Sequence, residues 1–169
     1  YWASTITGKF TETISEKENA YNHRLYYTIT KDFKTFKKSQ LLYNHRYNVI
    51  DGTVIKKGKR YYMFLKDETI EPPQKNIRMA SSKRFFEDYS SPGEPITGKY
   101  WAEGPTCLKL DDQWIVYFDK YRDHQMGAVA SRDLISWTDI SATISFPEGV
   151  RHGTVFIISK KVFHQLPIK

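Results

Sequence analysis

The chain has a single cysteine, Cys107, and no long hydrophobic run. One cysteine excludes an internal disulfide, and its place inside an apolar segment favours a core residue over a nucleophile. No stretch approaches the roughly 18 apolar residues of a membrane-spanning helix, so we expect no membrane partner. The opening residues, YWASTITGKF, also lack the basic and apolar regions of a signal peptide. The sequence predicts one domain of 169 residues with a buried core.

Several chemistries lack their usual motifs. The sequence contains no phosphate-binding glycine loop and no nucleophile elbow. Four histidines have no metal-ligand spacing, which argues against a transition-metal site: His23, His45, His124 and His164. The net charge of +7 suggests nucleic acid, but the lysines occur as scattered pairs near turns and strand ends. We therefore expect no nucleic-acid partner.

The sequence also lacks the 3.6-residue apolar period of a helix. Instead, short runs rich in Tyr, Phe, Val, Ile and Thr alternate with turn residues, which predicts an all-β fold. The expected strands cover residues 1–6, 24–30, 36–42, 49–55, 60–65, 76–82, 106–110, 113–118, 125–131, 136–140 and 153–159. Only the tail after Lys160 is expected to hold a turn of helix.

A repeat of about 50 residues is the most informative feature. Its units open with DGT at Asp51, EGPT at Glu103 and HGT at His152, which are separated by 52 and 49 residues. A second marker runs in phase, with TKDF at Thr30 and SRDL at Ser131. Four short strands per unit of this length are typical of a β-propeller blade, whereas a β-sandwich gives no reason for the repeat.

The first strand of every propeller blade lines the central channel, so the repeat predicts that Asp51, Glu103 and His152 share a pocket. Ionisable groups that face one pocket are costly unless they are used or mutually satisfied. The structural alternative is that they bond neighbouring strands and close the channel. Lys66 and Lys120 follow the second strands in matching positions, as ion-paired pocket residues or exposed strand ends.

The motifs VIDGT, WAEGPT, WIVYFDKY, SRDLISW and RHGTV resemble glycoside hydrolase family 43, from about residue 24 to residue 156. The resemblance implies a five-bladed β-propeller that trims arabinose, xylose or galactose units from plant-type polysaccharide side chains or oligosaccharides, with inversion. Alternatives are a non-catalytic carbohydrate-binding propeller and a protein-interaction propeller. The expected pieces are a partial blade at 1–48, complete blades at 49–98 and 99–148, and a closing strand within 149–169.

The same resemblance assigns roles to single residues. Glu103 is expected to be the general acid, and Asp51 to orient it and raise its pKa. His152 would lie near the channel axis, where a water molecule could link it to a structural calcium ion; no other cofactor is expected. Further substrate-binding candidates are Trp2, Trp101, Asp119 and Arg151. The family's general base precedes the matched region, so we expect this chain alone to be inactive, and the family implies a periplasmic or extracellular location.

Overall fold

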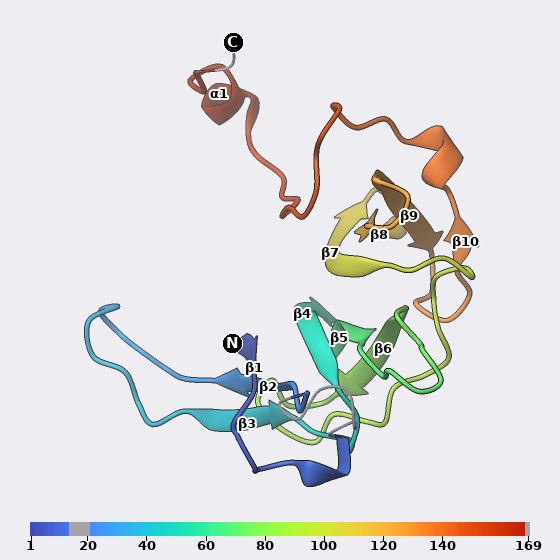
Figure 1. Ribbon diagram of the computed structural model, residues 1–169. Helices are drawn as coiled ribbons and strands as arrows, with labels where there is room; N and C mark the ends of the chain where they lie inside the picture. Colours follow the sequence, from blue (N-terminus) through green and yellow to red (C-terminus); the bar gives the residue numbers. More distant parts are fainter. Residues whose placement is uncertain (14–20, 168–169) are drawn as a thin grey trace.

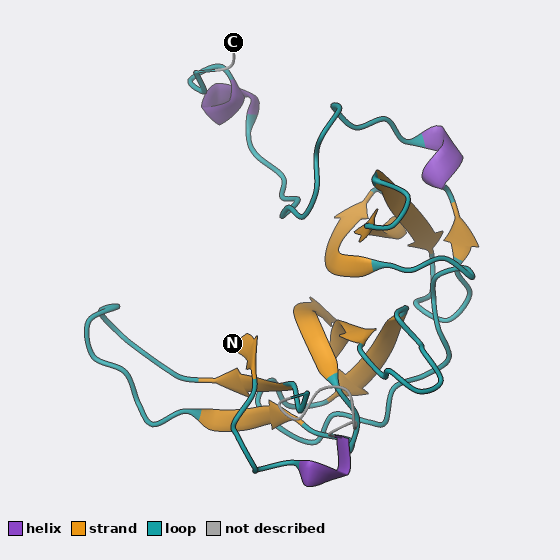
Figure 2. Ribbon diagram, viewed as in Figure 1, coloured by secondary structure: helices purple, strands orange, loops and turns teal. Residues whose placement is uncertain are grey.

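The computed structural model describes residues 1–13 and 21–167, and strands account for nearly all of its regular structure (Figures 1 and 2). The strands form three antiparallel sheets. The first sheet contains β1 (Trp2–Ser4), β2 (Arg24–Tyr27) and β3 (Gln40–Tyr43). The second contains β4 (Val49–Lys57), β5 (Arg60–Asp67) and β6 (Ile77–Ser82). The third contains β7 (Glu103–Leu110), β8 (Gln113–Lys120), β9 (Gln125–Ser131) and β10 (Thr138–Asp139).

The sheets follow one another along an open arc, and the part of the chain described here forms no closed ring (Figure 1). Within each sheet, strands that follow one another in the sequence pair side by side. Helical structure is limited to η1 (Thr11–Thr13), η2 (Ser141–Thr143) and α1 (Lys160–Phe163) in the described ranges. None of these described helices is long and apolar enough to cross a membrane.

The core lies between the sheets because successive side chains of a strand point to opposite faces. On β5, Met63 and Leu65 join the core that the second sheet shares with the first. Phe64, between them, joins the core that it shares with the third. All three side chains are fully buried. Cys107 packs at the edge of the second core, and burial raises the pKa of its thiol to about 12, as a core cysteine requires.

The all-β prediction is confirmed, and so is the helical turn after Lys160, where the Ser159 hydroxyl accepts a hydrogen bond from the Val162 N–H. The predicted strand 153–159, which was expected to close the set of blades, is wrong: these residues form an irregular segment. The segment lacks a neighbouring strand with which to form a ladder. One anchoring hydrogen bond joins the Val155 N–H to the Thr106 hydroxyl at 3.2 Å.

The second repeat marker forms the same turn in two places. Ser131 Oγ accepts from the Leu134 N–H, and Asp133 Oδ1 accepts from the N–H groups of Ile135 and Ser136. The hydrogen bonds from Ser136 and Ile135 lower the pKa of Asp133 to about 2. The turn that begins at Thr30 repeats this pattern, with Thr30 in place of Ser131 and Asp32 in place of Asp133.

Candidate functional site

The first strands β4 and β7 carry the same irregularity at their openings. Ile50 pairs with Lys66 and Thr53 with Phe64, so three steps on β4 match two on β5. Each opening therefore contains a β-bulge, which re-aims the side chains beside it.

The matching pairs on the third sheet are Glu103 with Asp119 and Thr106 with Tyr117. This register makes Asp51 equivalent to Gly104, and both have a left-handed backbone, with φ of 54° and 60°. The predicted equivalence of Asp51 with Glu103 is therefore wrong by one residue. The register also makes Lys66 the counterpart of Asp119 rather than of Lys120.

Despite this offset, Asp51, Glu103 and His152 meet at one point. The Gly104 N–H donates to Asp51 Oδ2 at 2.9 Å, and His152 Nε2 lies 2.8 Å from Glu103 Oε1. One polar atom from each of the three side chains lies within 4.8 Å of the others. Three residues from distant parts of the sequence thus form a single polar cluster.

An open hollow of about 370 Å³ lies beside this cluster. It is lined by Asp51, Gly52, Thr53, Gly104, Pro105, His152, Gly153 and Thr154. The walls come from the openings of all three repeat units, which the Thr53 hydroxyl helps to join by donating to the Pro105 carbonyl at 2.6 Å. A Cβ added to Gly104 would lie 3.0 Å from the His152 ring, so glycine keeps this ring close to the strand.

Glu103 is held by two basic groups at once. Its Oε2 accepts a hydrogen bond from Lys66 Nζ at 2.7 Å, while Oε1 faces His152. Burial raises the pKa of Glu103, but the hydrogen bonds and charges of Lys66 and His152 outweigh it and leave the pKa below its usual range. The expectation that Asp51 keeps Glu103 protonated is not met in this arrangement, because the two cationic partners lie closer to its oxygens.

Lys66 belongs to a buried ion network that the sequence pattern did not reveal. Its side chain is 4% exposed, pairs with both Glu103 and Glu68, and lies over the Tyr121 ring at 4.4 Å. Glu68 also pairs with Lys75. The charges alternate in sign, which satisfies groups that would be costly to bury alone. The position of Lys66 at the end of a second strand was the only available signal.

Asp119 makes the equivalent contact from the third sheet. Its side chain is fully buried, and its Oδ2 accepts a hydrogen bond from Arg151 Nε at 2.6 Å and lies 3.7 Å from His152 Nε2. Asp119 Oδ1 is buried with no hydrogen-bond partner in the described ranges. Lys66 and Asp119 therefore both reach forward to the residues that open the next repeat unit, with opposite charges.

The structure does not place the two tryptophan candidates in the lining of the hollow. The guanidinium of Arg122 lies 3.3 Å from the centre of the Trp101 ring and covers one of its faces. Trp2 lies on β1 of the first sheet and stacks on Tyr26 at 6.3 Å. Stacking on a sugar would have to use the other face of Trp101.

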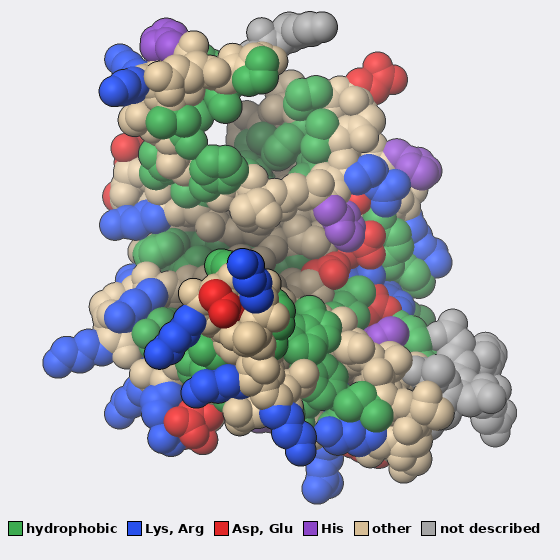
Figure 3. Space-filling model, turned by 90° about the vertical axis from the view of Figure 1, so that its left-hand side faces the viewer, with side chains coloured by type: hydrophobic (Ala, Val, Ile, Leu, Met, Phe, Trp, Pro, Cys, Tyr) green, Lys and Arg blue, Asp and Glu red, His purple; other side chains and the backbone are tan. Residues whose placement is uncertain are grey.

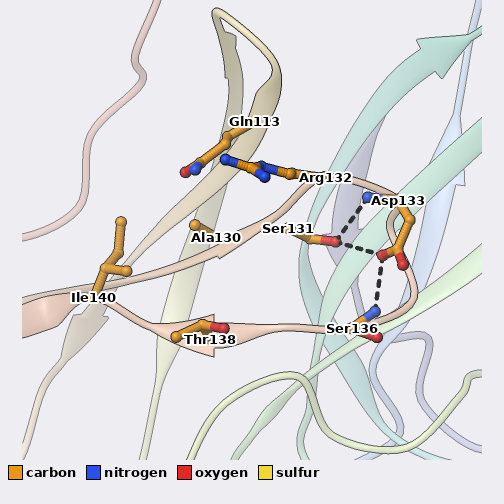
Figure 4. A pocket seen from close by; sticks show the side chains of 8 residues that line it. All are labelled: Gln113, Ala130, Ser131, Arg132, Asp133, Ser136, Thr138 and Ile140. Atoms are coloured by element: carbon orange, nitrogen blue, oxygen red, sulfur yellow. Dashed lines mark hydrogen bonds between the residues drawn. The ribbon is translucent and has the colours of Figure 1, made fainter.

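A second pocket lies at the outer edge of the third sheet, also with a volume of about 370 Å³ (Figure 4). Its lining includes the Ser131, Asp133 and Ser136 turn, in which Asp133 Oδ1 is occupied by hydrogen bonds of the turn. Arg132, also in the lining, is paired with Asp112. This pocket therefore offers no free carboxylate for acid–base chemistry.

Comparison with known proteins gives one family and a distant structural likeness. The family model described as a probable glycosyl hydrolase domain matches residues 1–163. Four solved chains match, among them the crystal structure of a thermostable family-43 glycoside hydrolase. That match has 11% identity and a TM-score of 0.48, and it covers 82% of this chain and 53% of the other. The chain thus spans about half the length of that protein, and no curated protein matches it.

Proposed function

Because this chain belongs to the family of probable glycosyl hydrolase domains, related to glycoside hydrolase family 43, we propose that it carries part of a carbohydrate-cleaving site. The observation that supports this best is the convergence of Asp51, Glu103 and His152 beside an open hollow. We place the O-glycosidic bonds of arabinose- or xylose-bearing side chains there, with Glu103 as the general acid. In this proposal the three sheets are blades of an incomplete five-bladed propeller.

The chemistry needs two carboxyl groups with different tasks. An inverting glycosidase uses one carboxylic acid to protonate the leaving oxygen and another carboxylate, about 6.5–9.5 Å away, to activate water. Asp51 fits the role of a positioning residue, because its carboxylate holds the backbone of Gly104, next to Glu103. In our proposal the base comes from outside the residues of this chain, and Glu103 gains its proton when the bound sugar weakens its contacts with Lys66 and His152.

A non-catalytic sugar-binding propeller is the second candidate. It is favoured by the lowered pKa of Glu103, which suits a carboxylate that accepts hydrogen bonds from sugar hydroxyls. Both candidates predict sugar binding at the hollow, and only the first predicts turnover. A propeller that serves as a protein-interaction platform predicts neither.

Titration of the isotopically labelled chain with arabinose, xylose and galactose tests the shared prediction. We expect amide shifts at Asp51, Gly104 and His152, because their backbone and side chains form the wall of the hollow. The variant Asp51→Asn should weaken the response, while Arg132→Gln, in the pocket of Figure 4, should leave it unchanged. Shifts confined to residues 131–140, or none with any sugar, would refute the proposed site.

We further propose a structural calcium ion at the same cluster. The carboxylates of Asp51 and Glu103 are the hard oxygen donors that Ca²⁺ prefers, and His152 would contribute through a water molecule. Binding to the folded state alone raises the unfolding midpoint as ligand is added. We expect calcium to raise the midpoint of the wild type and to have little effect on Asp51→Asn; equal midpoints in calcium and in chelator would argue against the ion.

By the same resemblance, we propose a periplasmic or extracellular location, since polymeric substrates do not enter cells freely. Cell fractionation of a producing strain checks this, and recovery of the protein solely from the cytoplasm would contradict it. The lysine and arginine side chains on the face in Figure 3 are dispersed and form no continuous stripe. Neither nucleic acid nor a membrane is part of this proposal.

A further inference from the structure

The loop that follows the third strand of a sheet packs onto the preceding sheet in two cases. After β9, Leu134 is 2% exposed, and Trp137 meets Phe64 of the second sheet edge-to-face at 5.7 Å. Lys57, at the hairpin end of the second sheet, donates to the Asp133 carbonyl at 3.0 Å. This loop therefore seals the interface between the third and second sheets.

The loop after β6 does the same one sheet earlier. Phe86 stacks on Tyr27 of the first sheet at 4.5 Å, and Phe85 lies 6.3 Å from the ring of Tyr1. Both interfaces join an aromatic residue of the loop to an aromatic residue of the sheet before it. Such pairs contribute beyond the area that they bury.

The first sheet has the same loop but no sheet for it to contact. The turn from Thr30 to Thr35 has the hydrogen bonds of the turn from Ser131 to Ser136. The residues equivalent to Leu134 and Trp137 are Phe33 and Phe36, which are 86% and 58% exposed. Phe33 and Leu134 share a left-handed backbone, with φ of 56° and 71°. Sequence and backbone are thus those of a docking loop.

The edge of the first sheet is open in the same direction. β2 precedes its turn as β9 does, so β1 corresponds to β8, the second strand of its sheet. In the described residues, nothing pairs with β1 at the position that β7 holds beside β8. An unpaired strand edge is a template for another strand.

We propose that the first sheet binds a further antiparallel sheet of this same repeat through the Phe33 loop, defined as residues 30–36. That sheet presents an aromatic side chain of its second strand to Phe33 and Phe36, as Phe64 does to Trp137. Its hairpin lysine reaches the carbonyl of Asp32, as Lys57 reaches that of Asp133. The side of the molecule that carries this loop faces the reader in Figure 3.

A synthetic hairpin with the sequence of residues 49–67 is the probe, because this segment covers the equivalent loop inside the chain. We expect its addition to the labelled chain to shift the amides of residues 30–36. The double variant Phe33→Ser, Phe36→Ser should weaken binding at least about tenfold. The control Ile135→Ser changes an exposed residue of the covered loop and should bind as the wild type does.

Unfolding by urea gives an independent readout. The double variant should unfold at the wild-type midpoint, because both rings are exposed, while Leu134→Ser should lower it clearly. No shift in residues 30–36 at saturating hairpin, or shifts that persist in the double variant, would overturn the proposal. So would a midpoint for the double variant as low as that of Leu134→Ser, because the rings would then belong to the chain's own core.

Discussion

Replacement of Lys66 by methionine is expected to lower the free energy of unfolding by about 3–5 kcal/mol, the usual loss when one partner of a buried ion pair is removed. Methionine keeps most of the length of the side chain but leaves Glu68 and Glu103 without their shared cation. The side chains of these two carboxylates are 8% and 19% exposed, so water compensates little. Urea denaturation at pH 7 measures the difference between the two proteins.

The size of this loss should depend on pH. The pKa of Glu103 is lower in the folded chain than its ordinary value near 4.5, so its contribution is present above that value and is lost as the pH falls through the folded pKa. The deficit of Lys66→Met should therefore shrink in acid. Lys59→Met, at an exposed turn, is the control and should cost less than about 0.5 kcal/mol. A loss below about 1 kcal/mol for Lys66→Met at pH 7 would show that the network does not stabilise the fold.

The strands were predictable because their residues obey a local rule. In β5 and β8, aromatic and branched side chains alternate between two cores, and each strand begins after a turn of charged residues or glycine. The convergence of Asp51, Glu103 and His152 was also predictable, because a repeat places equivalent strands side by side. Neither inference needs knowledge of distant contacts.

The details of the cluster were not predictable in the same way. A β-bulge at each strand opening moves Asp51 and Glu103 out of strict equivalence, and one-residue register shifts leave no clear mark in an apolar pattern. The pairing of Glu103 with Lys66 depends on the distance between two sheets. The segment 153–159 has the composition of a strand, but a strand also needs a partner.

The aromatic candidates show a similar limit. Trp101 lies two residues from Glu103 in the sequence, yet its side chain packs with Tyr121 and Arg122 outside the lining of the hollow. Proximity along a strand does not place two side chains on one face, because alternate residues point to opposite sides and a bulge changes the alternation. The positions of such platforms follow from packing.

The central claim is that Glu103 donates the proton during glycoside cleavage. Its most direct test is the turnover of aryl arabinofuranosides and xylosides by the complete protein that carries this chain. Glu103→Gln should lower the rate by about 10²–10⁴-fold, the usual contribution of a general acid, while the exposed control Glu94→Gln should leave it unchanged. The 169-residue chain alone should show no turnover, because the base is not among its residues. An unchanged rate in Glu103→Gln, or clear turnover by the chain alone, would contradict this account.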